Sequence, residues 1–208
     1  MTETILSTCP RRAAAALVLA FFATSASAGL YPPAAPPGSA FIRVFNGTTQ
    51  PKVSAQIGDK NVGDTPSLEA SPYIFLAPGS YKAKIGSATA DVPLQGSKCY
   101  TAALEQSGVH LFEQDCFNSQ LKALVSVFNL VDGTVSLKTA DGSQAVVDEV
   151  AANKSGHREV NPVKANLALY SGTTKLADAK PMTLERGKTF SLFVTGSASQ
   201  PMLIWSVN

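Results

Sequence analysis

The sequence predicts an all-β protein made of two tandem small β-sandwich domains, and three observations lead to this prediction. Helical signals are nearly absent after residue 28. The apolar segments that follow are short, rich in Val, Ile, Phe, Leu and Thr, and separated by Gly, Pro, Asp and Asn, which is typical of sandwiches and barrels. The tripeptide Val-Phe-Asn occurs twice, at 44–46 and 127–129, each time ending an apolar run. This recurrence suggests that one domain was duplicated.

The first 28 residues have the features of a secretory signal peptide. Arg11 and Arg12 form a basic start, residues 13–23 form an uncharged apolar core, and residues 26–28 (Ala-Ser-Ala) give the small-residue pattern of a cleavage site. The apolar core is shorter than the roughly 20 residues that span a bilayer. We therefore expect export and a mature chain of about 180 residues that does not insert into the membrane.

A proline-rich arm is expected at 29–38, directly after the cleavage site. Four prolines within residues 32–37 favour an extended, polyproline-like conformation. The arm is either a plain spacer or a docking strand for a partner. In the second case Tyr31, Pro32 and Pro33 are its candidate contact residues.

The first sandwich domain is predicted at 39–118. Its opening strand, 40–46, alternates the apolar side chains of Ile42 and Val44 with Arg43, as expected for a half-buried strand. Short runs of the same apolar character predict the remaining strands, at 53–57, 72–76, 81–85, 100–104 and 109–114.

The second sandwich domain is predicted at 119–208, and its order of segments matches the first. The segment 123–129 aligns with 40–46 at an offset of 83, and 182–194 aligns with 92–104 at an offset of 90. Further strands are predicted at 134–139, 145–150, 164–170, 189–195 and 202–207. In each copy, the Asn of Val-Phe-Asn is expected to end a strand before a turn.

The two cysteines of the mature chain, Cys99 and Cys116, are expected to form a disulfide, which is the default for such a pair after export. A two-residue turn at 107–108 would place the cysteines opposite each other on a hairpin, at a Cα separation within disulfide range. The same register places His110 opposite Glu105. The bridge would then act as a local staple of the hairpin.

Composition and motifs exclude several function classes. The mature chain carries 15 basic and 14 acidic side chains without a clustered basic patch, which argues against nucleic-acid binding and gives no electrostatic reason for membrane docking. The only charge cluster is 154–159. No His or Cys pair has metal-ligand spacing, calcium-loop spacing is missing, and glycine-rich phosphate loops are absent. We expect no metal and no cofactor.

Catalysis is not expected either. The sequence contains neither a Gly-x-Ser-x-Gly nucleophile elbow nor a Gly-Asp-Ser-Leu block. His157 lies in a polar stretch, so we expect it in a solvated loop. His110 is expected to be an exposed residue of a cross-strand pair. The prediction is therefore a protein without a catalytic site.

Several segments together resemble the AlgF family, periplasmic accessory proteins of alginate O-acetylation. The resemblance runs over essentially the whole mature chain and its signal, and it is carried by residues 29–46, 71–81, 161–170 and 182–194 and by the C-terminal strand with Trp205. The cysteine pair is not part of the family pattern.

The resemblance implies a periplasmic protein that is required for adding acetyl groups to the polysaccharide. It would work beside a membrane acetyl-transferring protein and SGNH-type acetyltransferases that hold the catalytic residues. We expect an adaptor that holds these partners together through strand edges or the proline-rich arm.

Two other functions stay open at this point. The first is a carbohydrate-binding module that presents alginate, with Trp205 as a candidate aromatic contact, although its apolar run favours core packing. The second is a transient acetyl carrier that uses a Ser or Thr hydroxyl.

Overall fold

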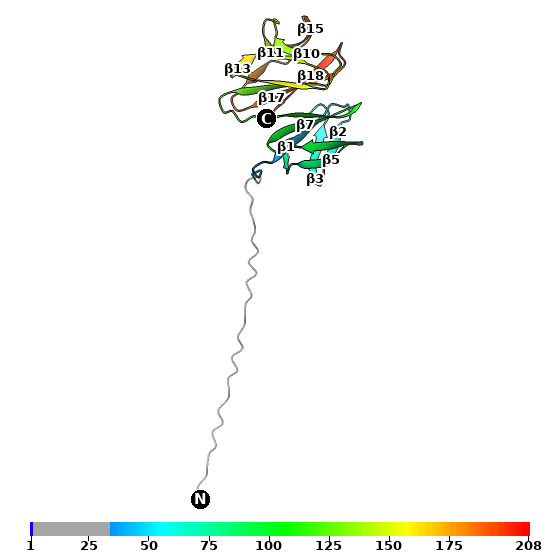
Figure 1. Cartoon of the computed structure of the whole chain (residues 1–208), viewed down its shortest axis with the longest axis vertical. Coiled ribbons are helices and arrows are strands. Elements are labelled where there is room, and N and C mark those ends of the chain that lie inside the picture. The colour runs from blue at the N-terminus through cyan, green and yellow to red at the C-terminus, as the bar shows by residue number, and fades with distance from the viewer. Residues whose placement is uncertain (2–33) are drawn as a thin grey trace. The chain divides into compact units, whose positions relative to one another are not determined.

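The strands of the computed structural model form two β-sandwiches in tandem, which confirms the predicted fold class (Figure 1). The structure describes Met1 and residues 34–208. The rest of the predicted signal peptide, and Tyr31, Pro32 and Pro33 of the predicted arm, lie outside the described residues. Both sandwiches belong to one compact unit, Ala35–Asn208.

The first sandwich contains two four-stranded sheets, which we call sheet A (order β4-β1-β7-β8) and sheet B (order β3-β2-β5-β6). Apolar side chains from both sheets, among them Ile42, Val44, Ala55 and Ile85, are buried in one core between them. The strands are β1 (Ala40–Asn46), β2 (Lys52–Ile57), β3 (Lys60–Pro66), β4 (Ile74–Leu76), β5 (Gly79–Ile85), β6 (Ala88–Leu94), β7 (Lys98–Glu105) and β8 (Gly108–Asp115).

The second sandwich contains sheet C (order β12-β9-β17-β18), sheet D (order β11-β10-β14-β15) and a two-stranded ribbon, β13-β16. Its core again collects apolar side chains from both large sheets, including Val127, Leu137, Leu169 and Leu192. The strands are β9 (Ala123–Asn129), β10 (Val135–Thr139), β11 (Ala145–Val150), β12 (Ser155–Val160), β13 (Val163–Ala165), β14 (Leu167–Ser171), β15 (Thr174–Asp178), β16 (Met182–Leu184), β17 (Thr189–Gly196) and β18 (Pro201–Val207).

The two sandwiches share strand order and register, as a duplication predicts. In sheet A, β1 runs parallel to β7 with Phe41 beside Cys99. In sheet C, β9 runs parallel to β17 with Leu124 beside Thr189. Leu124 lies 83 positions after Phe41, and Thr189 lies 90 positions after Cys99. These are the two offsets at which the sequence aligns with itself.

The Asn of each Val-Phe-Asn ends its strand, as predicted, and its side chain also makes buried hydrogen bonds that the sequence did not predict. Asn46 and Asn129 are both fully buried. The Asn46 amide donates to the carbonyls of Gln50 and Thr65, both at 3.2 Å, and its oxygen accepts from the Thr48 backbone N–H at 3.1 Å.

Asn129 repeats this pattern in the second sandwich. Its amide donates to the carbonyls of Gly133, at 2.9 Å, and Val150, at 3.0 Å, and its oxygen accepts from the Val131 backbone N–H at 3.1 Å. Each Asn therefore ties its own strand to the turn that follows and to the neighbouring strand of the other sheet, β3 or β11. A buried amide with all of its hydrogen bonds satisfied specifies this arrangement strongly.

The β7–β8 hairpin has a different register from the one predicted. Its two-residue turn is 106–107 rather than 107–108, and Glu105 pairs with Gly108. This register places Val109 opposite Leu104 and Leu111 opposite Ala102, so that apolar side chains meet in the core. In the predicted register, Val109 would lie at the hairpin tip, outside the core.

The structure also contains strands that the sequence interpretation missed, namely β3, β6, β12, β15 and β16. Four of them, β3, β12, β15 and β16, are short or polar with weak alternation of buried and exposed positions, whereas β6 alternates regularly. His157 lies in one of them, β12, where it pairs with Ser126 of β9. Its predicted place in a loop is wrong, whereas its exposure to solvent is as expected.

Candidate functional site

The two sandwiches contact each other through the outer faces of sheets A and C. Phe45 of β1 stacks on Phe193 of β17 with ring centroids 3.8 Å apart, and Phe193 stacks on Phe128 of β9 at 4.8 Å. Phe112 of β8 meets Phe128 edge-on at 5.3 Å. These residues and Ala103 form a third buried cluster, which we call the aromatic interface. It explains why β1 and β9 are buried on both faces.

Arg43 lies in the same contact, although the sequence placed it on the exposed face of a half-buried strand. Its side chain is fully buried because sheet C covers the outer face of sheet A. Nε donates to Thr101 Oγ1 at 3.1 Å, and Nη2 donates across the contact to Ser191 Oγ at 2.7 Å. The guanidinium also lies 4.9 Å from the centroid of the Tyr73 ring.

No carboxylate within residues 34–208 forms an ion pair with Arg43. Burial lowers the pKa of the guanidinium, and Tyr73 opposes this shift. The contact between the sandwiches therefore holds a cation that hydroxyl groups and an aromatic face stabilise.

A polar cleft of about 560 Å³ opens at the edge of this contact. Glu105 of β7 and Thr195 of β17 lie at its wall, and the Thr195 hydroxyl donates to Glu105 Oε1 at 2.8 Å. Glu105 packs so closely over Gly47 that a Cβ atom at Gly47 would lie 2.1 Å from Oε1. The half-buried carboxyl is thus held between the two sandwiches. Desolvation raises the pKa of Glu105 above its usual 4.5, and the hydrogen bond from Thr195 opposes the shift.

Glu105 is expected to make stability depend on pH. A carboxyl with a raised pKa in the folded state does not destabilise the protein below its unfolded pKa, where both states are protonated. The destabilisation grows as pH rises from the unfolded pKa to the folded pKa and is complete above it. Glu105→Gln keeps an acceptor for Thr195 but removes the charge. We therefore expect the variant to match the native protein in thermal melts below pH 4 and to exceed it in melting temperature at pH 7. The same difference in melting temperature between the variant and the native protein at both pH values would contradict this.

Ser107 and His110 also line the polar cleft. The Ser107 hydroxyl and His110 Nε2 lie 3.1 Å apart at the tip of the β7–β8 hairpin. His110 pairs with Ala103 rather than with Glu105, which corrects the predicted cross-strand pair. The sequence interpretation missed the Ser107–His110 contact because it rests on the observed turn at 106–107.

The predicted disulfide is confirmed, although its geometry differs from the prediction. Cys99 and Cys116 are bonded with their Cα atoms 5.1 Å apart. Cys99 pairs with Gln114 in the sheet, and Cys116 lies just beyond the end of β8. The bridge closes the open end of the hairpin next to the contact between the sandwiches, as a local staple would.

Trp205 lies in β18, opposite Leu192. Its side chain is partly buried and packs against the core of the second sandwich. Its indole Nε1 is buried and has no hydrogen-bond partner among the described residues. This placement follows the expected core packing. A role of Trp205 as an aromatic contact for a ligand stays a prediction.

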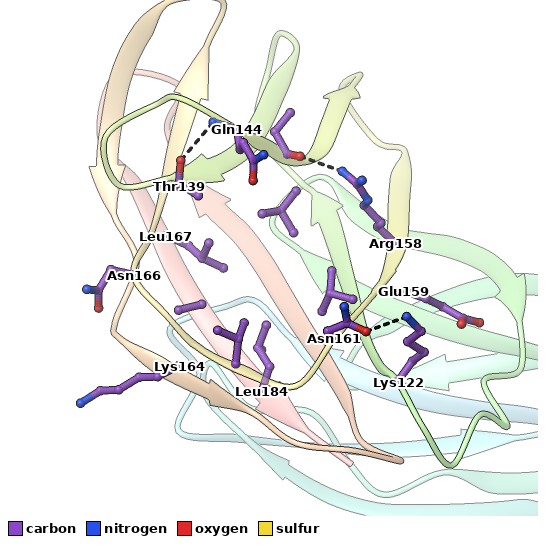
Figure 2. A pocket seen from close by; sticks show the side chains of 15 residues that line it. Lys122, Thr139, Gln144, Arg158, Glu159, Asn161, Lys164, Asn166, Leu167 and Leu184 are labelled. Atoms are coloured by element: carbon purple, nitrogen blue, oxygen red, sulfur yellow. Dashed lines mark hydrogen bonds between the residues drawn. The ribbon is translucent and has the colours of Figure 1, made fainter.

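A second cleft, of about 600 Å³, lies entirely within the second sandwich (Figure 2). We call it the basic cleft, because three cations line it: Lys122 before β9, Arg158 in β12 and Lys164 in β13. Lys122 Nζ donates to Asn161 Oδ1 at 2.6 Å, and Arg158 Nη1 donates to the Ala145 carbonyl at 2.9 Å. Leu167 and Leu184 contribute apolar surface. The sequence signalled only Arg158, through the charge cluster at 154–159.

In the part of the chain that the structure describes, no group of three or more His, Cys, Asp or Glu side chains is arranged to hold a metal ion. The same residues include no helix of the length and apolar character that crossing a bilayer requires.

Comparison with known proteins gives matches over most of the chain. The model of the family described as "Alginate O-acetyl transferase AlgF" matches residues 13–191. The alginate biosynthesis protein AlgF of Pseudomonas fluorescens is 44% identical over 207 residues, which cover 96% of this chain and 95% of the relative. AlgF of Pseudomonas aeruginosa is 42% identical over 189 residues, which cover 90% and 87%.

Two solved structures of single domains also match. The C-terminal domain of AlgF from P. aeruginosa is 48% identical, with a TM-score of 0.40, and the match covers 42% of this chain and 99% of the domain. The N-terminal domain of the same protein is 29% identical, with a TM-score of 0.36, and the match covers 39% and 99%. The family model and the near full-length relatives show that this chain belongs to the AlgF family of alginate biosynthesis proteins.

Proposed function

We propose that this protein is a non-catalytic periplasmic adaptor in the O-acetylation of alginate. It binds the SGNH-type acetyltransferases and the membrane acetyl-transferring protein of the pathway, and it holds them in position for acetyl transfer. Family membership supports the pathway. The disulfide supports an oxidising compartment, and the predicted signal peptide directs export.

The observation that carries the proposal is the buried contact between the two sandwiches. The aromatic interface and the Arg43–Ser191 hydrogen bond join the domains that we assign to 39–118 and 119–208. Because this contact is buried, each domain presents its remaining surface at a constant position relative to the other, which is what an adaptor with two partners needs. The proline-rich arm with Tyr31, Pro32 and Pro33 stays a predicted docking element.

The arrangement of the histidines supports a role without catalysis. His157 is exposed on an edge strand, and the Ser107–His110 contact lies at a hairpin tip. Within the described residues, no carboxylate is hydrogen-bonded to His110, as the orienting acid of a catalytic triad would be. The partners would supply the nucleophile and the base.

Binding and turnover assays on the purified mature protein test the proposal. We expect co-elution with a purified acetyltransferase of the pathway in size-exclusion chromatography, and no release of nitrophenol from p-nitrophenyl acetate above the buffer rate. Ser107→Ala is the matched variant for the acetyl-carrier alternative. A 42-dalton adduct on the native protein that is absent from Ser107→Ala would favour the acetyl-carrier function over the adaptor function. Failure to bind any acetyltransferase would refute the adaptor function.

A further inference from the structure

The charges of the basic cleft are not neutralised within the described residues. Four lysines outside the cleft form ion pairs within residues 34–208, for example Lys52 with Asp64 and Lys175 with Asp178. Lys122 and Arg158 instead bond to an amide and a backbone carbonyl, neither of which carries a compensating charge. Lys164 is exposed and forms no ion pair in residues 34–208. One carboxylate, that of Glu159, lines the cleft beside the three cations.

The duplication shows that the fold does not need these cations. Ala40 pairs with Leu76 in sheet A, and Ala123 pairs with Val160 in sheet C, so the two pairs are equivalent. Lys122 directly precedes Ala123, and Arg158 lies two positions before Val160. The same positions in the first sandwich hold the neutral residues Ser39 and Ile74.

The third cation, Lys164, also corresponds to a neutral residue in the first sandwich. Val163 pairs with Leu184 in the ribbon β13-β16, and the corresponding pair in the first sandwich is Gly79 with Leu94. Lys164 therefore corresponds to Ser80. All three cations are additions to the second sandwich that its twin folds without.

The first sandwich has a smaller cleft at the equivalent place, and its character is different. That cleft measures about 340 Å³ and carries one cation and one carboxylate, Lys60 and Asp59. Its wall includes the aromatic rings of Phe75 and Tyr81. By contrast, none of the described residues that line the basic cleft is aromatic. The duplicated positions have thus diverged toward positive charge in one copy only.

The lining of the basic cleft indicates the chemical class of its ligand. Cations beside an apolar floor of Leu167 and Leu184 match a chain that carries carboxylates and small apolar groups. Val163 is 55% exposed at the same cleft and is available for apolar contact. Aromatic rings, on which sugar rings commonly stack, are missing from the described residues that line the cleft. Edge strands β11 and β12, at the ends of sheets D and C, also contribute to the wall and retain unpaired backbone groups.

We propose that the basic cleft is the docking site for an acidic, extended segment of a partner protein, in which Asp or Glu alternates with apolar residues. Lys122, Arg158 and Lys164 attract its carboxylates, while the floor and Val163 accept its apolar side chains. The proposal deepens the adaptor function and rests on it, because it assigns one of the two partner surfaces to the second sandwich.

A charge-reversal variant tests the docking site in the full mature protein. Arg158→Glu combined with Lys164→Glu is compared with Lys60→Glu combined with Lys84→Glu. The control makes the same change of net charge at exposed lysines of the first sandwich that form no ion pair within residues 34–208. We expect the first pair to weaken binding of the pathway acetyltransferase by about tenfold or more, and the control pair by less than about twofold. Equal effects of the two pairs would overturn the docking site while leaving the adaptor function intact.

A second measurement does not depend on any acetyltransferase. The probe is a fluorescent peptide of alternating Asp and Leu or Val, compared with the same peptide carrying Asn in place of Asp. Fluorescence polarisation should show binding of the acidic peptide to the native protein, weakening as salt is raised, and loss of binding in Arg158→Glu/Lys164→Glu. No binding of the acidic peptide would refute the proposal. Saturable binding of oligomannuronate that the same variant abolishes would also refute it, by making the cleft a polysaccharide site.

Discussion

Replacing Phe193 with alanine is expected to lower the free energy of unfolding by about 3–5 kcal/mol, the usual cost of removing a large buried aromatic side chain. Phe193 is fully buried and stacks on both Phe45 and Phe128. Its loss would open a cavity at the contact between the sandwiches, where neither domain can relax without moving the other. Chemical denaturation monitored by the intrinsic fluorescence of Trp205 gives the measurement.

Met202→Ala is the control for this prediction. Met202 lies on the neighbouring strand, β18, but is 43% exposed. Its truncation is therefore expected to change the free energy of unfolding by less than about 0.5 kcal/mol. A cost of less than about 1 kcal/mol for Phe193→Ala would mean that the aromatic interface is not formed in solution. The main structural support for the adaptor would then be lost.

Asn46→Ala and Asn129→Ala are each expected to lower the free energy of unfolding by about 2–4 kcal/mol, because each leaves buried backbone groups without partners. Each native side chain makes two donor bonds to carbonyls and accepts one bond from a backbone N–H. Since the two asparagines occupy equivalent positions, the two variants should be destabilised to a similar extent in urea titrations.

The comparison variant here is Asn161→Ala. The side chain of Asn161 is exposed, and within residues 34–208 it bonds only to Lys122, so little change in stability is expected. If Asn129→Ala behaves like Asn161→Ala while Asn46→Ala is strongly destabilised, the structural equivalence of the two copies does not extend to their energetics.

Much of the fold was predictable because its signals are local. The apolar periodicity of 40–46 and 123–129, the turn residues between runs and the Val-Phe-Asn repeat depend only on neighbouring residues, and they predicted all-β structure and duplication correctly. The disulfide between Cys99 and Cys116 was also predicted correctly, since export and a pair of cysteines on one hairpin suffice for it. Polar edge strands such as β12 escaped prediction because their periodicity is weak.

The sequence by itself determined the main apolar strands, the two copies and the cysteine pair of this protein. Only the tertiary structure decided that Arg43 is buried, that Phe45 meets Phe193, and that Lys122, Arg158 and Lys164 line one cleft. The physical reason is that alternation along a strand separates two faces without saying what covers the outer one. When a second sheet covers that face, a side chain that alternation assigns to solvent becomes part of a core, and residues far apart in the chain come to share one surface.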